Sequence, residues 1–286
     1  VLWGSTYLAI RIAVQDGSGF PPMIMSATRV FAGSLILLGI SRFVKQESFH
    51  LTRNDTIVLA ISGLALWWIG NGLVALAETK VDSGYTALIV SCTPIWVAII
   101  ESRLDRKNPS LRLMISLFIG IAGIAVLNWP VISEGTIGDL RGAFMLIVAG
   151  LSWGAGSVYQ KRSNIQSSPE ISSAVQQVFG GIALFVTSLL INEPALSPSV
   201  SAWWAWGYLI IFGSVIAFTS FVKALTLLPP NIVFTYAYVN PVIAVILGFI
   251  ILNEPVTRWT LGGATLVIIG VLGVFKDQHK TMSLSH

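Results

Sequence analysis

Polar and aromatic side chains recur at helical spacing inside the long apolar stretches of this 286-residue chain. Trp3, Tyr7 and Arg11 are spaced by four residues, and Trp153 and Ser157 repeat that spacing in a later stretch. Residues three or four positions apart lie on one face of a helix. Such a face could line a cavity and bind a small molecule by stacking and hydrogen bonding, which is recognition chemistry and not catalysis.

Further residues of the same kinds complete the candidate substrate-binding set. They are Asn71, Tyr85, Cys92, Trp96, Tyr236, Tyr238 and Asn240. The last three lie on two faces of a helix, so one cavity cannot take all of them. Anchoring at the membrane interface is the alternative for any Trp or Tyr. That alternative fits Trp203–Trp206, at the end of an apolar stretch, better than Trp153, which lies deep inside one.

Arg29 is a candidate partner for a substrate carboxylate. It follows Pro22 by seven residues, which places it roughly 10 Å deep at a rise of about 1.5 Å per residue. A charge at such depth usually faces the protein interior and suggests a functional site. Pairing with backbone carbonyls or a polar neighbour is the structural alternative.

The residues that ion coupling, ATP binding, metal binding or catalysis would need are not apparent in the sequence. All thirteen Asp and Glu lie in loops or at the ends of apolar stretches. A proton or sodium relay normally uses a buried carboxylate, so this pattern favours downhill export without ion coupling. The chain has no phosphate-binding G-x-x-x-x-G-K-[ST] motif, its three His lie in a loop or the tail, and Cys92 is its only Cys. We therefore expect no cofactor, no metal site and no enzymatic activity.

The composition is that of a membrane protein. Of all residues 54% are hydrophobic and 10% charged, whereas a soluble domain carries roughly 25% charged residues. Ten apolar stretches are visible, at about 1–14, 22–43, 56–77, 82–101, 110–128, 140–160, 170–191, 202–225, 231–252 and 259–276. A span needs about 20 residues, so the first stretch is expected to continue into a preceding segment.

The positive charges predict the orientation. Twelve of the seventeen Lys and Arg fall in the connections after stretches 2, 4, 6 and 8 or in the C-terminal tail, and only Lys80, Arg141 and Arg258 fall on the other side. Short loops rich in Lys and Arg stay in the cytoplasm. We therefore expect a protein of the bacterial inner membrane with both termini cytoplasmic. Because the charge is dispersed over loops, nucleic acid is not an expected partner.

An offset of 147 residues relates the two halves of the chain. It brings Pro94, in VSCTPIWVAII, onto Pro241, in AYVNPVIAVIL, and Gly123 onto Gly270. Proline inside a helix removes a hydrogen bond and clashes with the preceding turn, at about 3 kcal/mol or more. Because this interruption of a helix occurs at equivalent positions in both halves, the pattern predicts two hinges, at Pro94 and Pro241, beside a central cavity. A packing kink is the alternative.

Each half contains five stretches, an odd number, so the second half would cross the membrane in the opposite sense to the first. The prediction is an all-α polytopic membrane protein whose ten transmembrane helices form two inverted five-helix repeats, residues 1–138 and 139–286. Inverted repeats are typical of secondary transporters, whose substrate site lies near the midplane between them.

At several of these positions the chain resembles a known family. LWGSTYLAIRIA, PPMIMSATRVFAGSLIL, the two prolines and LNEP followed by LGGATLVIIGVLGV are similar to the EamA branch of the drug/metabolite transporter superfamily. The resemblance implies ten spans and export of amino acids or other small metabolites, and bacterial members include aromatic amino acid exporters. One departure is that the first half has Arg106 and Lys107 where the second has Glu254 in LNEP.

The expected function is therefore a secondary transporter that exports amino acids, bulky neutral or aromatic ones among them, by alternating access. A transporter of another metabolite or drug, or a channel-like facilitator, is the alternative, although charged rings that would line a pore are absent. A membrane-embedded enzyme would need a buried catalytic pair, which the sequence lacks. The expected partners are a small-molecule substrate and the lipid bilayer, with a monomer as the assembly.

Overall fold

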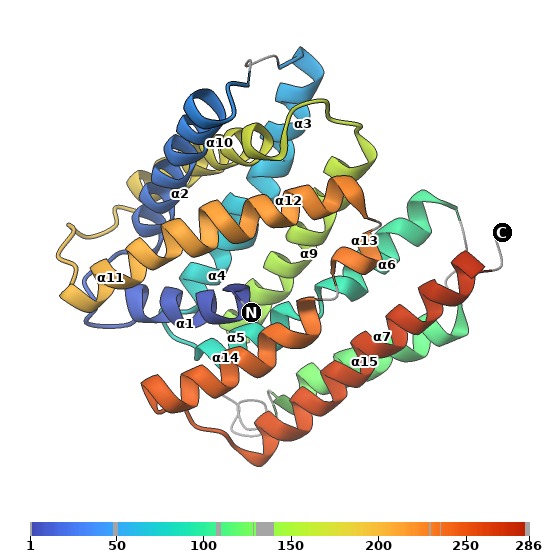
Figure 1. Ribbon diagram of the computed structural model, residues 1–286. Coiled ribbons are helices and arrows are strands. Elements are labelled where there is room, and N and C mark those ends of the chain that lie inside the picture. Colours follow the sequence, from blue (N-terminus) through green and yellow to red (C-terminus); the bar gives the residue numbers. More distant parts are fainter. Residues whose placement is uncertain are drawn as a thin grey trace.

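The structure is a computed structural model that describes residues 2–47, 51–106, 110–127, 129, 140–228, 230–234 and 236–283. Within those ranges every regular element is a helix (Figure 1). Among them, six stretches are long and apolar enough to cross a membrane: Pro22–Val44, Arg53–Ala77, Ser83–Leu104, Leu140–Arg162, Pro169–Leu190 and Val200–Leu227. Four shorter apolar helices accompany them: Leu2–Val14, Met114–Leu127, Val239–Leu252 and Arg258–Gly273. The predicted all-helical, multi-pass membrane protein is confirmed, and the count of ten spans stays a prediction.

The elements follow the chain in this order: α1 (Leu2–Val14), α2 (Pro22–Gly39), η1 (Ile40–Val44), α3 (Arg53–Gly63), η2 (Leu64–Asn71), α4 (Gly72–Ala77), α5 (Ser83–Val90), α6 (Thr93–Leu104), α7 (Leu111–Leu127), α9 (Leu140–Arg162), α10 (Pro169–Leu190), α11 (Val200–Tyr208), η4 (Leu209–Ala217), α12 (Phe218–Leu227), α13 (Pro230–Val233), α14 (Tyr236–Leu252) and α15 (Arg258–Ser283). The three η segments are π-helical, and each continues an α-helix.

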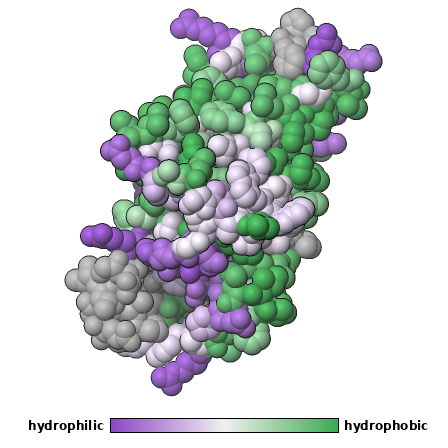
Figure 2. Space-filling model, turned by 90° about the vertical axis from the view of Figure 1, so that its left-hand side faces the viewer, coloured by the Kyte–Doolittle hydropathy of each residue, from purple (hydrophilic) through white to green (hydrophobic). Residues whose placement is uncertain are grey.

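The outer surface is strongly apolar. Large hydrophobic side chains such as Phe43, Phe118, Trp204 and Ile250 are well exposed. Figure 2 shows apolar side chains over broad areas of one face, with hydrophilic residues at its top and bottom and along its left-hand side. A soluble monomer rarely exposes apolar patches of more than a few hundred Å². This surface is suited to contact with lipid.

Two helix pairs form opposite edges of the molecule. The pair α7 and α15 lies along one edge, and α2 packs against α10 near the other (Figure 1). Glycine allows the close approach of α7 and α15: a methyl group on Gly123 would lie 2.7 Å from the Val267 backbone nitrogen, and one on Gly270 would lie 2.7 Å from that of Gly120. The 147-residue offset converts one contact into the other, because it relates Gly123 to Gly270 and Gly120 to Val267. The two helices therefore present equivalent faces to each other.

The remaining helices lie between these pairs. Helix α1 packs against α5, α11, η4 and α14, while α9 packs against η2, α4, α5 and α6. Elements from both ends of the chain therefore surround the same central region. Two of the π-helical segments, η2 and η4, belong to this region, and π-helical turns inside α-helices are frequent at functional sites.

The two prolines have different local structures. Helix α5 ends at Val90 and α6 begins at Thr93, with Pro94 in its first turn, so the span Ser83–Leu104 is interrupted where the proline pattern predicted a bend. Proline suits the first turn of a helix because its missing N–H has no partner there. Pro241 instead lies inside α14, which runs without interruption from Tyr236 to Leu252. Whether either position moves as a hinge stays a prediction.

Two glutamates, each located just after the end of a helix, cap the start of another helix that is distant in the sequence. Glu193, after α10, accepts hydrogen bonds from the backbone nitrogens of Met23 and Ile24 at 2.8 and 2.9 Å, at the start of α2. Glu254, after α14, accepts bonds from the Ser83 nitrogen and hydroxyl at 2.9 and 2.8 Å and from the Gly84 nitrogen at 3.1 Å, at the start of α5. Each cap joins a second-half loop to a first-half helix.

The two turns that carry these glutamates share a backbone conformation. Asn192 and Asn253, one residue before the two glutamates, have positive φ angles of 50° and 55°, a conformation that Asn tolerates and that turns the chain at a helix end. Arg106 has the same conformation, at 53°, but Lys107 follows it and lies outside the described residues. The sequence departure at Lys107 thus removes the carboxylate from an otherwise similar turn.

Candidate functional site

A narrow cavity of about 60 Å³ lies in the central region. It is lined by Trp3, Thr6, Tyr7, Ile10, Arg29, Trp67, Gly70, Asn71, Val74, Val90, Ala149, Trp153 and Tyr236. A water needs roughly 10–15 Å³ of such space, and a cavity that admits benzene measures about 150 Å³. The cavity therefore has room for a few waters, and a bulky amino acid could enter only after the surrounding helices separate.

Aromatic rings form one wall of the cavity. Trp3 lies at the centre of this wall, with ring centroids 5.6 Å from Trp153, 4.8 Å from Tyr236 and 5.0 Å from Phe221. The rings of Trp3 and Trp153 meet edge to face, an arrangement that the aromatic quadrupole favours. The lining rings of this wall come from α1, α9 and α14, and Phe221 of α12 packs against all three, so the wall depends on contact between the two halves of the chain.

Arg29 forms the charged part of the cavity. Its side chain is buried; Nε donates to the Ser214 hydroxyl at 2.9 Å, and Nη1 donates to the Asn71 Oδ1 at 3.3 Å. The guanidinium also lies over the Trp67 ring, 5.3 Å from its centroid. Within the described residues no carboxylate forms an ion pair with it. The two π-helical segments η2 and η4 thus position a buried cation that has no carboxylate of the described residues in direct contact with it.

The cavity also holds hydrogen-bond donors without acceptors. The indole nitrogens of Trp67 and Trp153 are buried and have no hydrogen-bond partner, although the Tyr236 hydroxyl is close to Trp153. Indole nitrogen and guanidinium only donate hydrogen bonds. A ligand rich in acceptors, such as one with a carboxylate, would satisfy these groups, and an isolated cation would not.

The structure brings several predicted site residues together. Those on the cavity wall are Trp3, Tyr7, Arg29, Asn71, Trp153 and Tyr236. Trp67, which lies four residues before Asn71 and therefore on the same helical face, lines the cavity as well. Sequence reasoning left out the small and aliphatic residues Gly70, Val74 and Ala149, which also line it and carry no signal of their own in the sequence.

Other predicted site residues lie elsewhere. Tyr85 lines an outer vestibule, Trp96 packs beside Gly150 of α9, and the Ser157 hydroxyl donates to the Trp153 carbonyl at 2.7 Å. Asn240 is buried in α14, where its backbone carbonyl lies close to Gly4. The side chain of Tyr238 lies outside the described residues. The structure therefore supports a smaller site than the sequence proposed.

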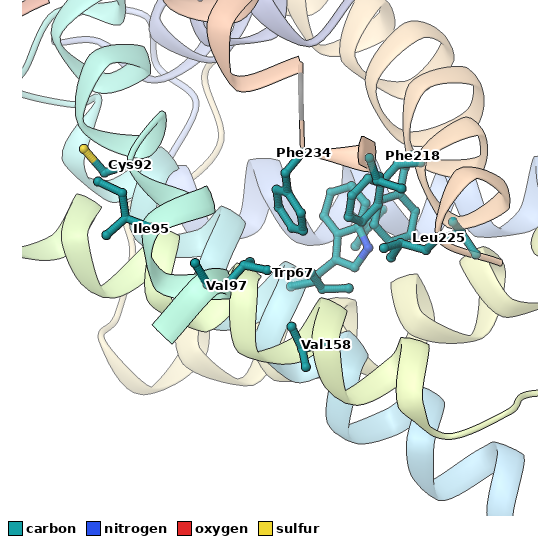
Figure 3. Packing of buried hydrophobic residues seen from close by; sticks show 14 of the residues in the cluster. Trp67, Cys92, Ile95, Val97, Val158, Phe218, Leu225 and Phe234 are labelled. Atoms are coloured by element: carbon teal, nitrogen blue, oxygen red, sulfur yellow. The ribbon is translucent and has the colours of Figure 1, made fainter. Parts of the chain in front are cut away.

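Cys92 lies in an apolar cluster and not on the cavity wall. It is 2% exposed and packs in the same cluster as Ile95 and Val97. In Figure 3, Cys92 and Ile95 lie at one end of this cluster and Phe218 and Leu225 at the other. The bend before Pro94 directs the Cys92 thiol toward the protein interior and away from the cavity.

We expect a small charged thiol reagent to leave Cys92 unmodified in the folded protein, because a thiol in apolar surroundings does not form the reactive thiolate. Mass spectrometry of labelled protein, with and without denaturant, measures this. Labelling should occur only in denaturant. Rapid labelling of the folded protein that substrate slows would instead place Cys92 on an open transport pathway.

Contrary to the expectation from the sequence, three carboxylates of the described residues are buried, at Asp55, Glu78 and Glu254, and Glu78 differs from the other two in its surroundings. Glu78 is the first residue after the span Arg53–Ala77, yet its side chain is completely buried. Neither of its carboxylate oxygens has a hydrogen-bond partner. Burial raises the pKa of this carboxyl well above its usual range, and the nearby Glu254 carboxylate adds to the effect. The loop position in sequence concealed this residue because α1, α5 and the turn after α14 cover it.

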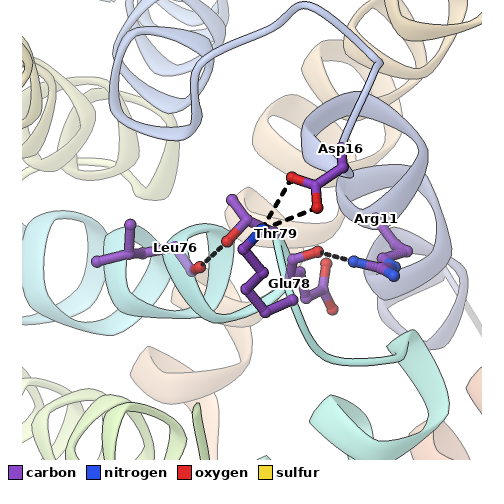
Figure 4. A network of polar contacts seen from close by, with 6 residues as sticks. Arg11, Asp16, Leu76, Glu78 and Thr79 are labelled. Carbon is purple, nitrogen blue, oxygen red and sulfur yellow. Dashed lines mark hydrogen bonds and ion pairs between the residues drawn. The ribbon is translucent and has the colours of Figure 1, made fainter. Parts of the chain in front are cut away.

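Arg11 has a structural role beside Glu78. Its Nη1 donates to the Glu78 backbone carbonyl at 2.6 Å (Figure 4). Asp16 pairs with Lys80 at 2.8 Å. Hydrogen bonding to Lys80 lowers the pKa of the Asp16 carboxyl. Helix α4 therefore ends against α1, which holds the following turn over the central cavity.

An open vestibule of about 770 Å³ lies beyond this turn. Its lining includes the residues on either side of Glu78, namely 76–77 and 79–82, together with Tyr85, Arg141, Gly142 and Met145. Tyr7, one of the cavity residues, lies close enough to Glu78 for the two side chains to interact electrostatically. Glu78 thus lies between the central cavity, which Tyr7 lines, and the vestibule, which its neighbours Ala77 and Thr79 line.

Comparisons with known proteins agree with a transporter. The EamA-like transporter family matches residues 1–129 and 140–276. The chain is 32% identical to the uncharacterized inner membrane transporter YedA of Escherichia coli, over 96% of this chain and 89% of that protein. It is 22% identical to the uncharacterized transporter YoaV of Bacillus subtilis, over 95% and 92%. One solved crystal structure, 16% identical, aligns with a TM-score of 0.67 over 96% of both chains, which extends the likeness to the fold.

Proposed function

Because this chain belongs to the EamA-like transporter family, we propose that it exports amino acids, bulky neutral or aromatic ones among them, by alternating access. The observation that carries the proposal is the cavity chemistry. Arg29 and the unpartnered indole nitrogens of Trp67 and Trp153 provide donors for a carboxylate, and the rings around Trp3 provide an apolar surface for a large side chain.

The proposal includes an architecture. The halves 1–138 and 139–286 are two inverted repeats of five spans, the membrane is the bacterial inner membrane, and both termini are cytoplasmic. The matched contacts of Gly123 and Gly270 support the repeat. The vestibule beside Glu78, with Lys80 and Arg141 on its wall, would then open to the outside.

Counterflow in proteoliposomes tests the function. Vesicles preloaded with one unlabelled amino acid should accumulate the same labelled amino acid when the protein transports it, across a panel of aromatic, aliphatic and polar amino acids. Saturable accumulation supports a transporter. Flux without counterflow would indicate the channel-like alternative, and no flux for any member of the panel would exclude amino acids as substrates.

Trp153→Ala should reduce counterflow of the bulky substrates by about tenfold. Contact between two aromatic rings contributes roughly 0.5–1.5 kcal/mol beyond the effect of the area buried, and the alanine variant loses this contact with the substrate. Trp153→Phe should retain most of the activity. Trp204→Ala is the matched control, since Trp204 is 78% exposed on the outer surface, and it should leave counterflow unchanged. Equal effects of the alanine variants would argue that Trp153 has no special role.

A further inference from the structure

Glu78 is a buried carboxyl group that the transporter fold does not use as a structural cap. The buried glutamate nearby, Glu254, holds the start of α5 through three donor groups. Glu78 caps no helix: both of its oxygens are buried and neither makes a hydrogen bond of ordinary geometry, although the Thr86 hydroxyl lies close enough to affect the carboxyl. A carboxylate buried without a partner is strongly unfavourable, and such a group binds a proton instead.

The charged and titratable groups around Glu78 come from every neighbouring element. Tyr7 and Arg11 face it from α1, Arg29 from α2, and Glu254 from the turn after α14. Arg11 is engaged by the Glu78 backbone carbonyl. Asp82 and Arg141 lie farther out, on the vestibule wall. Burial raises the pKa of Asp82 as well, so it disfavours the charged form of both carboxyl groups in this turn.

The Glu78 carboxyl and the cavity cation influence each other. Coulombic attraction links Glu78 to Arg29. When Glu78 is ionised, it partly offsets the charge of Arg29 and repels any carboxylate that binds there. When Glu78 is protonated, the charge of Arg29 is fully available. Coupling of two sites is reciprocal, so a carboxylate bound at Arg29 must also strengthen proton binding at Glu78.

We propose that Glu78 is a proton-binding site and that this protein moves one proton together with each carboxylate-bearing substrate. The proton comes from water on one side of the membrane, binds a Glu78 oxygen as the substrate carboxylate reaches Arg29, and returns to water when the opposite side opens. This inference rests on the proposed function for its substrate. It replaces transport without ion coupling, which the positions of the acidic residues in the sequence had favoured.

Infrared spectroscopy of the purified protein tests the proton site without any substrate. A protonated carboxyl group has a C=O stretch distinct from that of a carboxylate. The native protein should show this band near neutral pH and lose it as pH rises, and Glu78→Gln should lack it. Asp16→Asn, which removes an exposed carboxylate paired with Lys80, should retain the band. A native spectrum without the band, or an unchanged band in Glu78→Gln, overturns the proposal.

Substrate binding at different pH values tests the coupling. Tryptophan fluorescence reports binding of the amino acid with the largest counterflow, since Trp3, Trp67 and Trp153 line the cavity. Native affinity should fall by about tenfold as pH rises, inside the 5- to 150-fold range typical of coupled sites. Because Gln resembles the protonated carboxyl, Glu78→Gln should bind at high pH as the native protein does at low pH. This gain in affinity separates the role of Glu78 from damage to the fold.

Proton movement gives the final measurement. Liposomes with a pH-sensitive dye inside should acidify as labelled substrate enters through the native protein, and Glu78→Gln should carry substrate without acidification. Acidification that persists in Glu78→Gln, or native transport without acidification, overturns the coupling. Failure of every labelled amino acid to be transported would overturn the proposed function and the coupling with it, while the infrared result would still decide whether Glu78 holds a proton.

Discussion

Arg29→Gln is expected to lower counterflow of amino acids by at least about tenfold. A hydrogen bond to a charged group contributes about 1.5–3 kcal/mol, and each 1.4 kcal/mol is a factor of ten in affinity. Gln keeps hydrogen-bonding capacity toward Ser214 and Asn71, the two partners of Arg29, but loses the charge. Binding by tryptophan fluorescence and counterflow in proteoliposomes measure the loss. Arg29→Lys should be intermediate, because Lys keeps the charge without the planar fork.

Asn71→Asp tests the same site without removing the arginine. The Asn71 Oδ1 accepts from Arg29 at 3.3 Å, so an isosteric carboxylate there would neutralise the cation and compete with a substrate carboxylate. Counterflow should fall, while thermal stability is maintained or increased. Arg162→Gln, in an exposed pair with Asp105, is the control and should behave as the native protein. Full activity in both Arg29→Gln and Asn71→Asp would mean that Arg29 only supports the fold.

Glu254→Ala is expected to produce the largest loss of stability, about 2–4 kcal/mol. The buried carboxylate accepts bonds from the Ser83 nitrogen and hydroxyl and from the Gly84 nitrogen. Its removal leaves the first N–H groups of α5 without acceptors, and a hydrogen bond to a charged group makes a net contribution of about 1.5–3 kcal/mol. Thermal unfolding in detergent, followed by tryptophan fluorescence, should show a clear decrease in Tm.

Glu193→Ala is the matched control for Glu254→Ala. Glu193 makes the same kind of cap at the start of α2, but it is only half-buried and its bonds go to two donors. Water can replace it more readily, so a loss of about 1 kcal/mol is expected, the ordinary value for a helix cap. Gly248→Ala should resemble Glu254→Ala, since a methyl group at Gly248 would collide with the Glu254 carboxylate. Equal stability of the two glutamate variants would refute the importance of burial at Glu254.

Local sequence patterns predicted the helices well because each depends on nearby residues. Pro94 predicted the interruption between Val90 and Thr93, since proline removes a backbone donor wherever it occurs. Pro241, at the equivalent position, lies within an unbroken helix. The same residue type therefore gave two outcomes. Neighbouring helices determine whether the freed carbonyl groups find other partners, and sequence spacing contains no information about those neighbours.

The candidate site was predictable only in part, for a related reason. Helical spacing indicated the face of α1 that carries Trp3 and Tyr7, and both line the cavity. Cys92 has a similar spacing relation to Trp96 but points into an apolar cluster, because the turn before Pro94 changes the direction of the helix face. Periodicity identifies a face, but only packing shows which partner that face meets.

The sequence by itself determined that this chain is a helical membrane protein, that its halves share a pattern at 147 residues, and that Arg29 lies deep in a span. Composition and spacing suffice for these conclusions because lipid requires long apolar helices whose backbone groups are all satisfied internally. Only the tertiary structure placed Glu78 in the interior. A carboxylate that follows a span in the sequence is expected to reach water, but here α1, α5 and the turn after α14 close over it. The burial of a side chain is decided by segments distant in the chain, and no local pattern encodes it.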